Sequence, residues 1–395
     1  MHDRLIEDQA EFESLCDHIR EVGEVAFDTE FVSEFTYRPE LGLLQFATRK
    51  QAVAVDPYQV RDLSAWWRIM SDDQTTIVVH GGREEVRFCL NLGGHRPGRL
   101  VDVQVAEGLR GRSFPLNYTA LVARVLGERT HGKETRTDWR RRPLTPRQIA
   151  YALEDVEHML AIWDRQKRSL ADRGRLTWAE AEFQRMIDEV EQEKTREGWL
   201  RLPGVQSLSP GERRVARELY VWRDSAAATR DKPARKILRD DLVVELAKRQ
   251  PSTEHDLIAT RDMNRSDYRR MAGEMLACIA QAVTLPEIKL PKVRRSDQDQ
   301  DEQIVAQLLS LALSNLCAQE NVAHALVGTN ADLRHLVRWH VFGDQTGDPP
   351  RLLQGWRAEL CGNLFNDVLD GKISIRVSDP QSDHPLTFER TSGCE

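Results

Sequence analysis

Residues 25–31, VAFDTEF, decide the fold of this chain, because they combine the apolar composition of a buried strand with two acids. Asp28 and Glu30 are two residues apart, so on a strand their side chains project from the same face. Neighbouring carboxylates repel each other and are costly to desolvate, and a shared cation removes both penalties. Oxygen ligands favour Mg²⁺ or Mn²⁺ over zinc. The stretch predicts a metal site; the alternative is a solvated strand end whose acids face water.

The composition indicates a multi-domain globular protein. At 395 residues the chain exceeds what one compact core holds, so we expect two or three domains. The net charge of −7 argues against a uniformly basic surface but leaves room for a local basic track. The six cysteines are scattered without a CxxC pair, which argues against a zinc knuckle or a disulfide framework. Without a signal peptide or a membrane-length apolar run, we expect a cytoplasmic protein with no membrane association.

Strand and helix patterns alternate up to about residue 170, which predicts an α/β domain around a mixed sheet. Residues 1–24 have the spacing of a short helix. The links between the first three strand patterns are short, which favours an antiparallel meander. The strand patterns lie at 25–31, 42–47, 51–56, 76–79 and 100–103, and helix patterns lie around 63–67 and at 83–92, 116–126 and from 145.

A second acid follows the strand that ends at His80. In the helix pattern that begins at Arg83, Glu85 shares a face with Phe88 and Cys89, so it points towards the sheet. A Glu on a buried face usually has a partner, although a partly exposed helix acid is the alternative. We consider His80 a candidate to touch substrate; a structural histidine with satisfied hydrogen bonds is the other interpretation.

Tyr151 and Asp155 lie at spacing i, i+4 on the helix that Thr145 and Pro146 begin, so they share one face. A phenol beside a carboxylate is a plausible catalytic pair. The alternative is that both are ordinary surface side chains without a catalytic role. The basic run at residues 133–142 surrounds Trp139. Such a run suits a nucleic-acid backbone, but a solvated loop anchored by a buried Trp explains it equally well.

The order of these motifs resembles the DEDD exonuclease family, and the Tyr151 spacing resembles its tyrosine branch. The sequence around these motifs resembles the bacterial ribonuclease D family over residues 1 to about 170. The resemblance is seen in FDTEF (27–31), TYRP (36–39), LGLLQ (41–45) and TDWRRRPL (137–144). The resemblance implies a ribonuclease H-like mixed sheet flanked by helices. One departure is Glu85, where the family has Asp; the extra methylene predicts an altered metal preference or rate.

The resemblance implies two-metal phosphodiester hydrolysis with two divalent ions, Mg²⁺ or Mn²⁺, and nucleoside 5′-monophosphates as products. Asp28 would bridge both ions, while Glu30 and Asp155 would hold the first. Tyr151 would orient the attacking water, and Glu85 would help to hold the second ion. Four further residues are weaker candidates for substrate contact, namely Thr29, Phe31, Tyr37 and His80.

The second half of the chain is mostly helical in pattern, and part of it resembles an HRDC domain, a small helical module. Its first part is locally basic, which indicates either phosphate contact or a solvated helix face. The C-terminal helices are candidates for a second, diverged HRDC-like bundle. We predict an exonuclease domain at 1–170, a helical connector at 171–205, an HRDC-like domain at 206–286, a linker at 287–303, a C-terminal helical domain at 304–380 and a loose tail at 381–395.

Three functions follow from these patterns. The first is a monomeric 3′-to-5′ exoribonuclease that acts on RNA with a single-stranded 3′ end, tRNA precursors by family resemblance. The second is a 3′-to-5′ DNA exonuclease, because the same acids can support hydrolysis of strands built on ribose or on deoxyribose. The third is a nucleic-acid-binding protein in which Glu85 has weakened catalysis.

Overall fold

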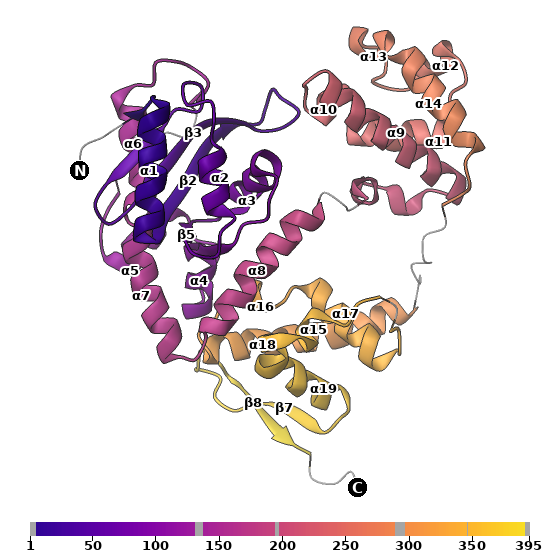
Figure 1. Cartoon of the computed structure of the whole chain (residues 1–395). Coiled ribbons are helices and arrows are strands. Elements are labelled where there is room, and N and C mark those ends of the chain that lie inside the picture. Colours follow the sequence, from indigo (N-terminus) through magenta and orange to yellow (C-terminus); the bar gives the residue numbers. More distant parts are fainter. Residues whose placement is uncertain (1–4, 131–136, 194–196, 289–296, 346, 392–395) are drawn as a thin grey trace.

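A computed structural model describes residues 5–130, 137–193, 197–288, 297–345 and 347–391, which form three units (Figure 1). The N-terminal unit is a six-stranded sheet covered by helices on both faces. The middle unit is a helical bundle, and the C-terminal unit combines helices with a two-stranded hairpin. Within the described ranges, every helix is too short or too polar to span a lipid bilayer.

The sheet has the strand order β1-β4-β3-β2-β5-β6 and mixes both pairing directions. β2 and β4 pair antiparallel to β3, as the short links predict, whereas β1, β5 and β6 pair in parallel. The strands are β1 (Leu5–Ile6), β2 (Glu24–Val32), β3 (Glu40–Ala47), β4 (Ala52–Val55), β5 (Thr76–Val79) and β6 (Arg99–Asp102).

β2, the acidic strand, lies near the middle of the sheet and separates two hydrophobic cores. Val25 and Phe27 face one core, and Ala26 and Val32 face the other. Asp28 and Glu30 continue the Ala26 face, because side chains alternate along a strand. The burial of both faces therefore fixes the direction of the two acids.

Eight α-helices surround this sheet, with a π-helical turn after α3. Asp8 caps the start of α1, and a Thr145 capping box with Pro146 begins α6. The helices are α1 (Gln9–Val22), α2 (Ser64–Met70), α3 (Arg83–Phe88), α4 (Val103–Arg110), α5 (Tyr118–Leu126), α6 (Pro146–Glu157), α7 (Met159–Asp172) and α8 (Leu176–Glu193), and the π-turn is Cys89–Gly93.

α8 lies within the predicted helical connector at 171–205 and is helical as expected. Its buried face reaches both cores of the N-terminal unit, with Phe183 in one and Met186 and Ile187 in the other. Figure 1 shows α8 running between this unit and the C-terminal unit. The high charge of its exposed side is typical of a solvated helix face.

The middle unit has a core of its own. Its longest helix, α9, starts with a Ser209 capping box and packs against α11 and α14. The elements are two short 3-10 turns (Gly198–Arg201, Val205–Ser207), α9 (Pro210–Thr229), α10 (Ala234–Ile237), α11 (Asp240–Arg249), α12 (Glu254–Ala259), α13 (Ser266–Arg270) and α14 (Ala272–Thr284).

The C-terminal unit differs from the prediction at both ends. Helix α15 starts at Asp297, so part of the predicted 287–303 linker is helical, and 289–296 lie outside the described residues. The predicted loose tail contains a strand, β8, that pairs with β7. The elements are α15 (Asp297–Gln319), α16 (His324–Val327), α17 (Asn330–Val341), a 3-10 turn (Arg351–Leu353), α18 (Gly355–Arg357), a π-turn (Ala358–Gly362), α19 (Asn363–Leu369), β7 (Ile373–Val377) and β8 (Leu386–Arg390).

A buried ion pair joins the C-terminal unit to α8. The Arg357 guanidinium donates to Glu182 at 2.6 Å, and the Trp356 indole N–H donates to the same oxygen at 2.9 Å. Burial alone would raise the pKa of Glu182, but the hydrogen bond and charge of Arg357, with other cations nearby, lower it to about 2. The pair therefore stabilises this interface wherever Glu182 is ionised.

We expect Arg357→Met to lower the free energy of unfolding by about 3 kcal/mol, because Glu182 would stay buried without its main partner. The folded pKa of Glu182 is depressed, so the contribution is present above pH 4.5 and is lost as the pH falls towards 2. Urea unfolding at pH 7 measures the change. The exposed Arg376–Glu389 pair supplies the control, since Arg376→Met should leave the free energy of unfolding nearly unchanged. Equal effects of the two variants would contradict this role.

Candidate active site

Three of the predicted catalytic residues line one cavity of about 380 Å³ in the N-terminal unit. Asp28 comes from β2, and Tyr151 and Asp155 come from α6, which packs on β2, β3 and β4. The Tyr151 hydroxyl lies close enough to the Asp155 carboxyl to lower the pKa of that carboxyl. The i, i+4 spacing on α6 therefore joins the phenol and the acid at the wall of this cavity.

The other two acids lie beside this cavity. Glu85, on α3, is only 4% exposed, and its carboxylate accepts a hydrogen bond of 2.6 Å from the Thr29 hydroxyl. Glu30 is partly buried and lies within electrostatic reach of both Asp155 and Glu85. The structure thus gives Glu85 the partner that its position on a buried face predicts.

Charge repulsion marks the acids as one electrostatic group. Burial raises the pKa of Asp28 well above its usual range, and the charges of Glu85 and Asp155 raise it further. Burial, then Asp155 and Glu85, raise the pKa of Glu30 to about 8. Burial also raises the pKa of Glu85 to about 7 and that of Asp155 to about 6. Four carboxyls that oppose one another's ionisation form a site with excess negative charge.

An all-oxygen set with uncompensated negative charge fits a hard divalent cation. Among the described residues, however, no three His, Cys, Asp or Glu side chains are already grouped closely enough to hold a metal ion. Two of the four carboxylates are instead engaged in hydrogen bonds, Glu85 with Thr29 and Asp155 with Tyr151. The donor chemistry fits a divalent cation, and a closed ligand shell would require these side chains to reorient.

His80 lines the same cavity, and its position is fixed by neighbouring groups. Its Nε2 donates to the Leu116 carbonyl at 2.9 Å, and its ring meets Tyr118 edge-on. Gly81, which follows it, has φ +68°, a conformation that favours glycine. The histidine therefore has a structural partner and also a position at the cavity wall.

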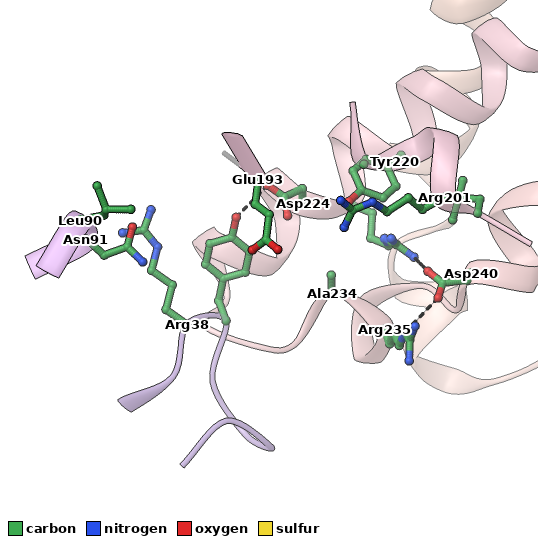
Figure 2. A pocket seen from close by; sticks show the side chains of 14 residues that line it. Arg38, Leu90, Asn91, Glu193, Arg201, Tyr220, Asp224, Ala234, Arg235 and Asp240 are labelled. Atoms are coloured by element: carbon green, nitrogen blue, oxygen red, sulfur yellow. Dashed lines mark hydrogen bonds and ion pairs between the residues drawn. The ribbon is translucent and has the colours of Figure 1, made fainter. Parts of the chain in front are cut away.

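The other candidates for substrate contact lie at different places in the structure. Thr29 is buried against Glu85, and Phe31 packs edge-on against Phe88. Tyr37 lines a different cavity, between the N-terminal and middle units. Its hydroxyl donates to Asp224, which Figure 2 shows at the wall of this cavity. The acidic cavity has neither Phe31 nor Tyr37 among its lining residues.

Several lining residues of the acidic cavity carried no signal in the sequence. Gln104 is one of them, and its amide donates to the Leu116 carbonyl at 2.8 Å beside His80. The side chain of Asn117 caps α5, a pattern that indicates a helix start and no site. The residues not anticipated are Gln104, Asn117, Tyr118, Thr119, Thr130, Glu154 and Met159.

The described part of the basic run at 133–142 is anchored by its Trp; residues 131–136 lie outside the described residues. Trp139 is buried and stacks near Tyr151, with ring centroids 6.5 Å apart. Arg140 pairs with Asp138, and Arg142 pairs with the buried Asp56. From residue 137 onwards, the anchored-loop interpretation agrees with the structure better than a free phosphate track.

Comparisons with known proteins agree with this architecture. A profile described as 3′-5′ exonuclease matches residues 4–171, and the HRDC domain profile matches residues 212–279. Ribonuclease D of Gluconacetobacter diazotrophicus is 30% identical over 380 residues, with 94% of each chain covered. The crystal structure of Escherichia coli RNase D, described as an exoribonuclease involved in structured RNA processing, superposes with a TM-score of 0.83 at 26% identity, covering 94% of this chain and 99% of that one. A Bifidobacterium adolescentis protein of 21% identity shares the fold, with a TM-score of 0.68 over 93% of this chain and 97% of that one.

The N-terminal unit is therefore a 3′-5′ exonuclease domain, and the middle unit contains an HRDC domain. The chain belongs to the ribonuclease D family and is a 3′-5′ exoribonuclease, a hydrolase that depends on divalent metal. The resemblance found in the VAFDTEF stretch and the motifs after it is confirmed.

We expect Thr29→Val to raise the Mg²⁺ concentration needed for half-maximal activity severalfold, because Glu85 would lose the hydrogen bond that positions its carboxylate. Leaving a buried acceptor without its donor should also lower the free energy of unfolding by about 1–3 kcal/mol. Thr29→Ser keeps the hydroxyl and is the matched control. If the Val and Ser variants need the same Mg²⁺ concentration and have the same free energy of unfolding in urea, this hydrogen bond does not position the Glu85 carboxylate.

The metal-free protein should lose stability as the pH rises from about 4.5 to 8. Over this range folded Glu30 holds a proton that the unfolded chain releases, so the folded state binds more protons. Added Mg²⁺ should restore the melting temperature most strongly near pH 8, and Glu30→Gln should flatten the metal-free profile. Melting curves with EDTA and with Mg²⁺ measure both effects. A metal-free profile that rises up to pH 8 would exclude the assigned shift.

Proposed function

We propose that the enzyme removes nucleotides stepwise from single-stranded 3′ ends of structured RNAs, tRNA precursors among them. Nucleoside 5′-monophosphates are the products. The observation that carries the proposal is the cavity in which Asp28, Tyr151 and Asp155 meet beside Glu30 and Glu85. The role of the Escherichia coli relative in structured RNA processing supports the substrate class.

We assign the following roles in metal binding and catalysis to the residues of this chain. Asp28 lies centrally, since Glu85, Asp155 and Glu30 all act on its pKa, and it would contact both of two divalent ions, Mg²⁺ or Mn²⁺. Two such ions, when bound, would generate the attacking hydroxide and stabilise the leaving oxygen. Glu30 and Asp155 would hold one ion, and Glu85 would contribute to the other.

Tyr151 would orient the attacking water. Burial and the Asp155 carboxylate raise the pKa of its phenol, so the hydroxyl stays protonated at neutral pH and serves as a hydrogen-bond donor. The raised pKa values of the carboxyls mean that cation binding must displace protons, which makes metal affinity depend on pH. A monomer in the cytoplasm remains the expectation from the sequence.

We expect Asp28→Asn to reduce hydrolysis of a 3′-labelled single-stranded RNA to below roughly one hundredth of the parent rate, with an unchanged circular dichroism spectrum. The loss of charge should also raise the melting temperature of the metal-free protein, because Asp28 is held against three other acids. A matched single-stranded DNA, assayed with Mg²⁺ and Mn²⁺, should be degraded more slowly than the RNA.

Faster loss of the DNA would favour the DNA exonuclease. Binding of RNA without degradation by the parent protein would favour a binding protein with weakened catalysis. Residual activity of Asp28→Asn near the parent rate would contradict the assignment of the metal site.

A further inference from the structure

The connection between β2 and β3, residues 33–39, ties the catalytic strand to the HRDC domain. It leaves β2 two residues after Glu30 and extends from the sheet towards α10 (Figure 1). The Tyr37 hydroxyl donates to Asp224 at 2.7 Å, and its backbone amide donates to Asp231 at 3.1 Å. The connection therefore has a fixed place on the HRDC domain, and cavities on its two sides are built from both domains.

The cavity on the Tyr37 and Arg38 side, about 780 Å³, is close to charge balance (Figure 2). It is lined by four arginines and three acids. Two of the arginines, Arg223 and Arg235, share the carboxylate of Asp240. An anionic strand gains little from cations that already have carboxylate partners.

The cavity on the Glu34 and Phe35 side, about 680 Å³, carries a clear excess of positive charge. Five cationic side chains line it against two acidic ones, although the whole chain has a net charge of −7. Apolar side chains are interleaved with the charges. The lining residues are Glu34, Phe35, Arg230, Lys232, Pro233, Lys236, Ile237, Arg265, Asp267, Arg270 and Met271.

Three of the five cations are exposed and have no carboxylate partner among the described residues, namely Lys232, Lys236 and Arg265. Arg265 lies over the Tyr268 ring, 5.4 Å from its centre, which leaves the two lysines available to an outside ligand. By contrast, Arg230 pairs with Glu274 at 2.6 Å, and Arg270 pairs with Asp267. An unpaired lysine that meets a phosphate releases counterions without first breaking an ion pair.

Phe35 adds an aromatic surface to this basic cavity. It is 59% exposed and is the only exposed phenylalanine among the described residues. The Arg140 guanidinium lies 4.6 Å from the centre of the ring and covers part of it. An exposed ring among cations is the combination with which proteins hold single-stranded nucleic acid, because each base offers a face to the ring and each phosphate a charge.

We propose that this cavity, the Phe35 groove, binds the single-stranded RNA that lies upstream of the 3′ end being cleaved. Phe35 stacks with a base, and Lys232 and Lys236 contact phosphates. The inference rests on the proposed function, because it takes RNA as the substrate. Glu30 and Phe35 are five residues apart, so at most about 17 Å of chain separates them. At the spacing of a stacked strand, about 3.4 Å per nucleotide, about five nucleotides span this distance.

The test compares a 16-nucleotide and a 4-nucleotide single-stranded RNA of one repeated sequence. Fluorescence anisotropy of the labelled 16-mer, in an Asp28→Asn background that prevents degradation, measures binding. We expect Phe35→Leu to weaken binding roughly tenfold and Phe35→Trp to retain it, because only the ring stacks. Lys232→Ala with Lys236→Ala should lower the slope of log K against log salt by about 1.4, at about 0.7 per phosphate contact.

Lys248→Ala is the matched control, since Lys248 is an exposed lysine of the same domain outside the groove and should leave the 16-mer affinity unchanged. In the otherwise unmodified enzyme, the Phe35 and lysine variants should slow degradation of the 16-mer several times more than that of the 4-mer. If these variants bind the 16-mer as tightly as the parent, or if degradation of the 16-mer and of the 4-mer slows equally, RNA does not bind in the Phe35 groove. Failure of the parent to degrade even the 4-mer would instead count against the proposed function, and the anisotropy data would still decide on the groove.

Discussion

The constraint on which the candidate site depends is the burial of four carboxyls close together on a rigid scaffold. Asp28 and Glu30 are fixed by a strand that is buried on both faces, Asp155 by a capped helix, and Glu85 by a hydrogen bond to Thr29. The raised pKa values show that this arrangement is unfavourable for the protein alone. Strain of this kind persists at functional sites because the surrounding fold determines the side-chain positions. A divalent cation bound at the site we propose would relieve it, so the fold would prepare the site at the expense of its own stability.

The two flanking units are attached to this scaffold by different contacts. The C-terminal unit shares a hydrophobic core with the sheet domain and adds the buried Glu182–Arg357 pair. The HRDC domain has a separate core and contacts the sheet domain through Tyr37, which its core partly covers. The HRDC domain thus docks on the connection that follows the acidic strand. Only a few backbone residues separate Tyr37 from Glu30 and Asp28. A change in the position of the HRDC domain would therefore be transmitted to these two acids over a short distance along the chain.

Local patterns predicted the sheet domain well because its strands and caps are strong short-range signals. The acidic strand, the meander and the capped helix α6 all follow from alternation and capping residues. The two-residue strand β1 carries no such signal, since it exists only through its pairing with β4. β8 was also missed, although it alternates, because the Asn315 side chain that fixes its start lies 71 residues earlier in the sequence.

The site was predictable in its chemistry but not in its geometry. Residue types and order pointed to Asp28, Glu85 and Asp155, whereas the hydrogen bond that engages Glu85 depends on Thr29, 56 residues earlier. The place of Tyr37 depends on Asp224, 187 residues further along, which no local pattern reports. Long-range partners of this kind decide which polar residues reach the cavity and which hold domains together.

The most direct test of the central claim is a crystal structure of the parent protein soaked with Mn²⁺ and a nucleoside 5′-monophosphate, with anomalous data collected at the manganese edge. The account predicts two anomalous peaks within the acidic cavity, both in contact with Asp28 and flanked by Glu30, Glu85 and Asp155. Peaks elsewhere on the molecule, or carboxyls of residues 28, 30 and 155 that bind no manganese, would contradict it.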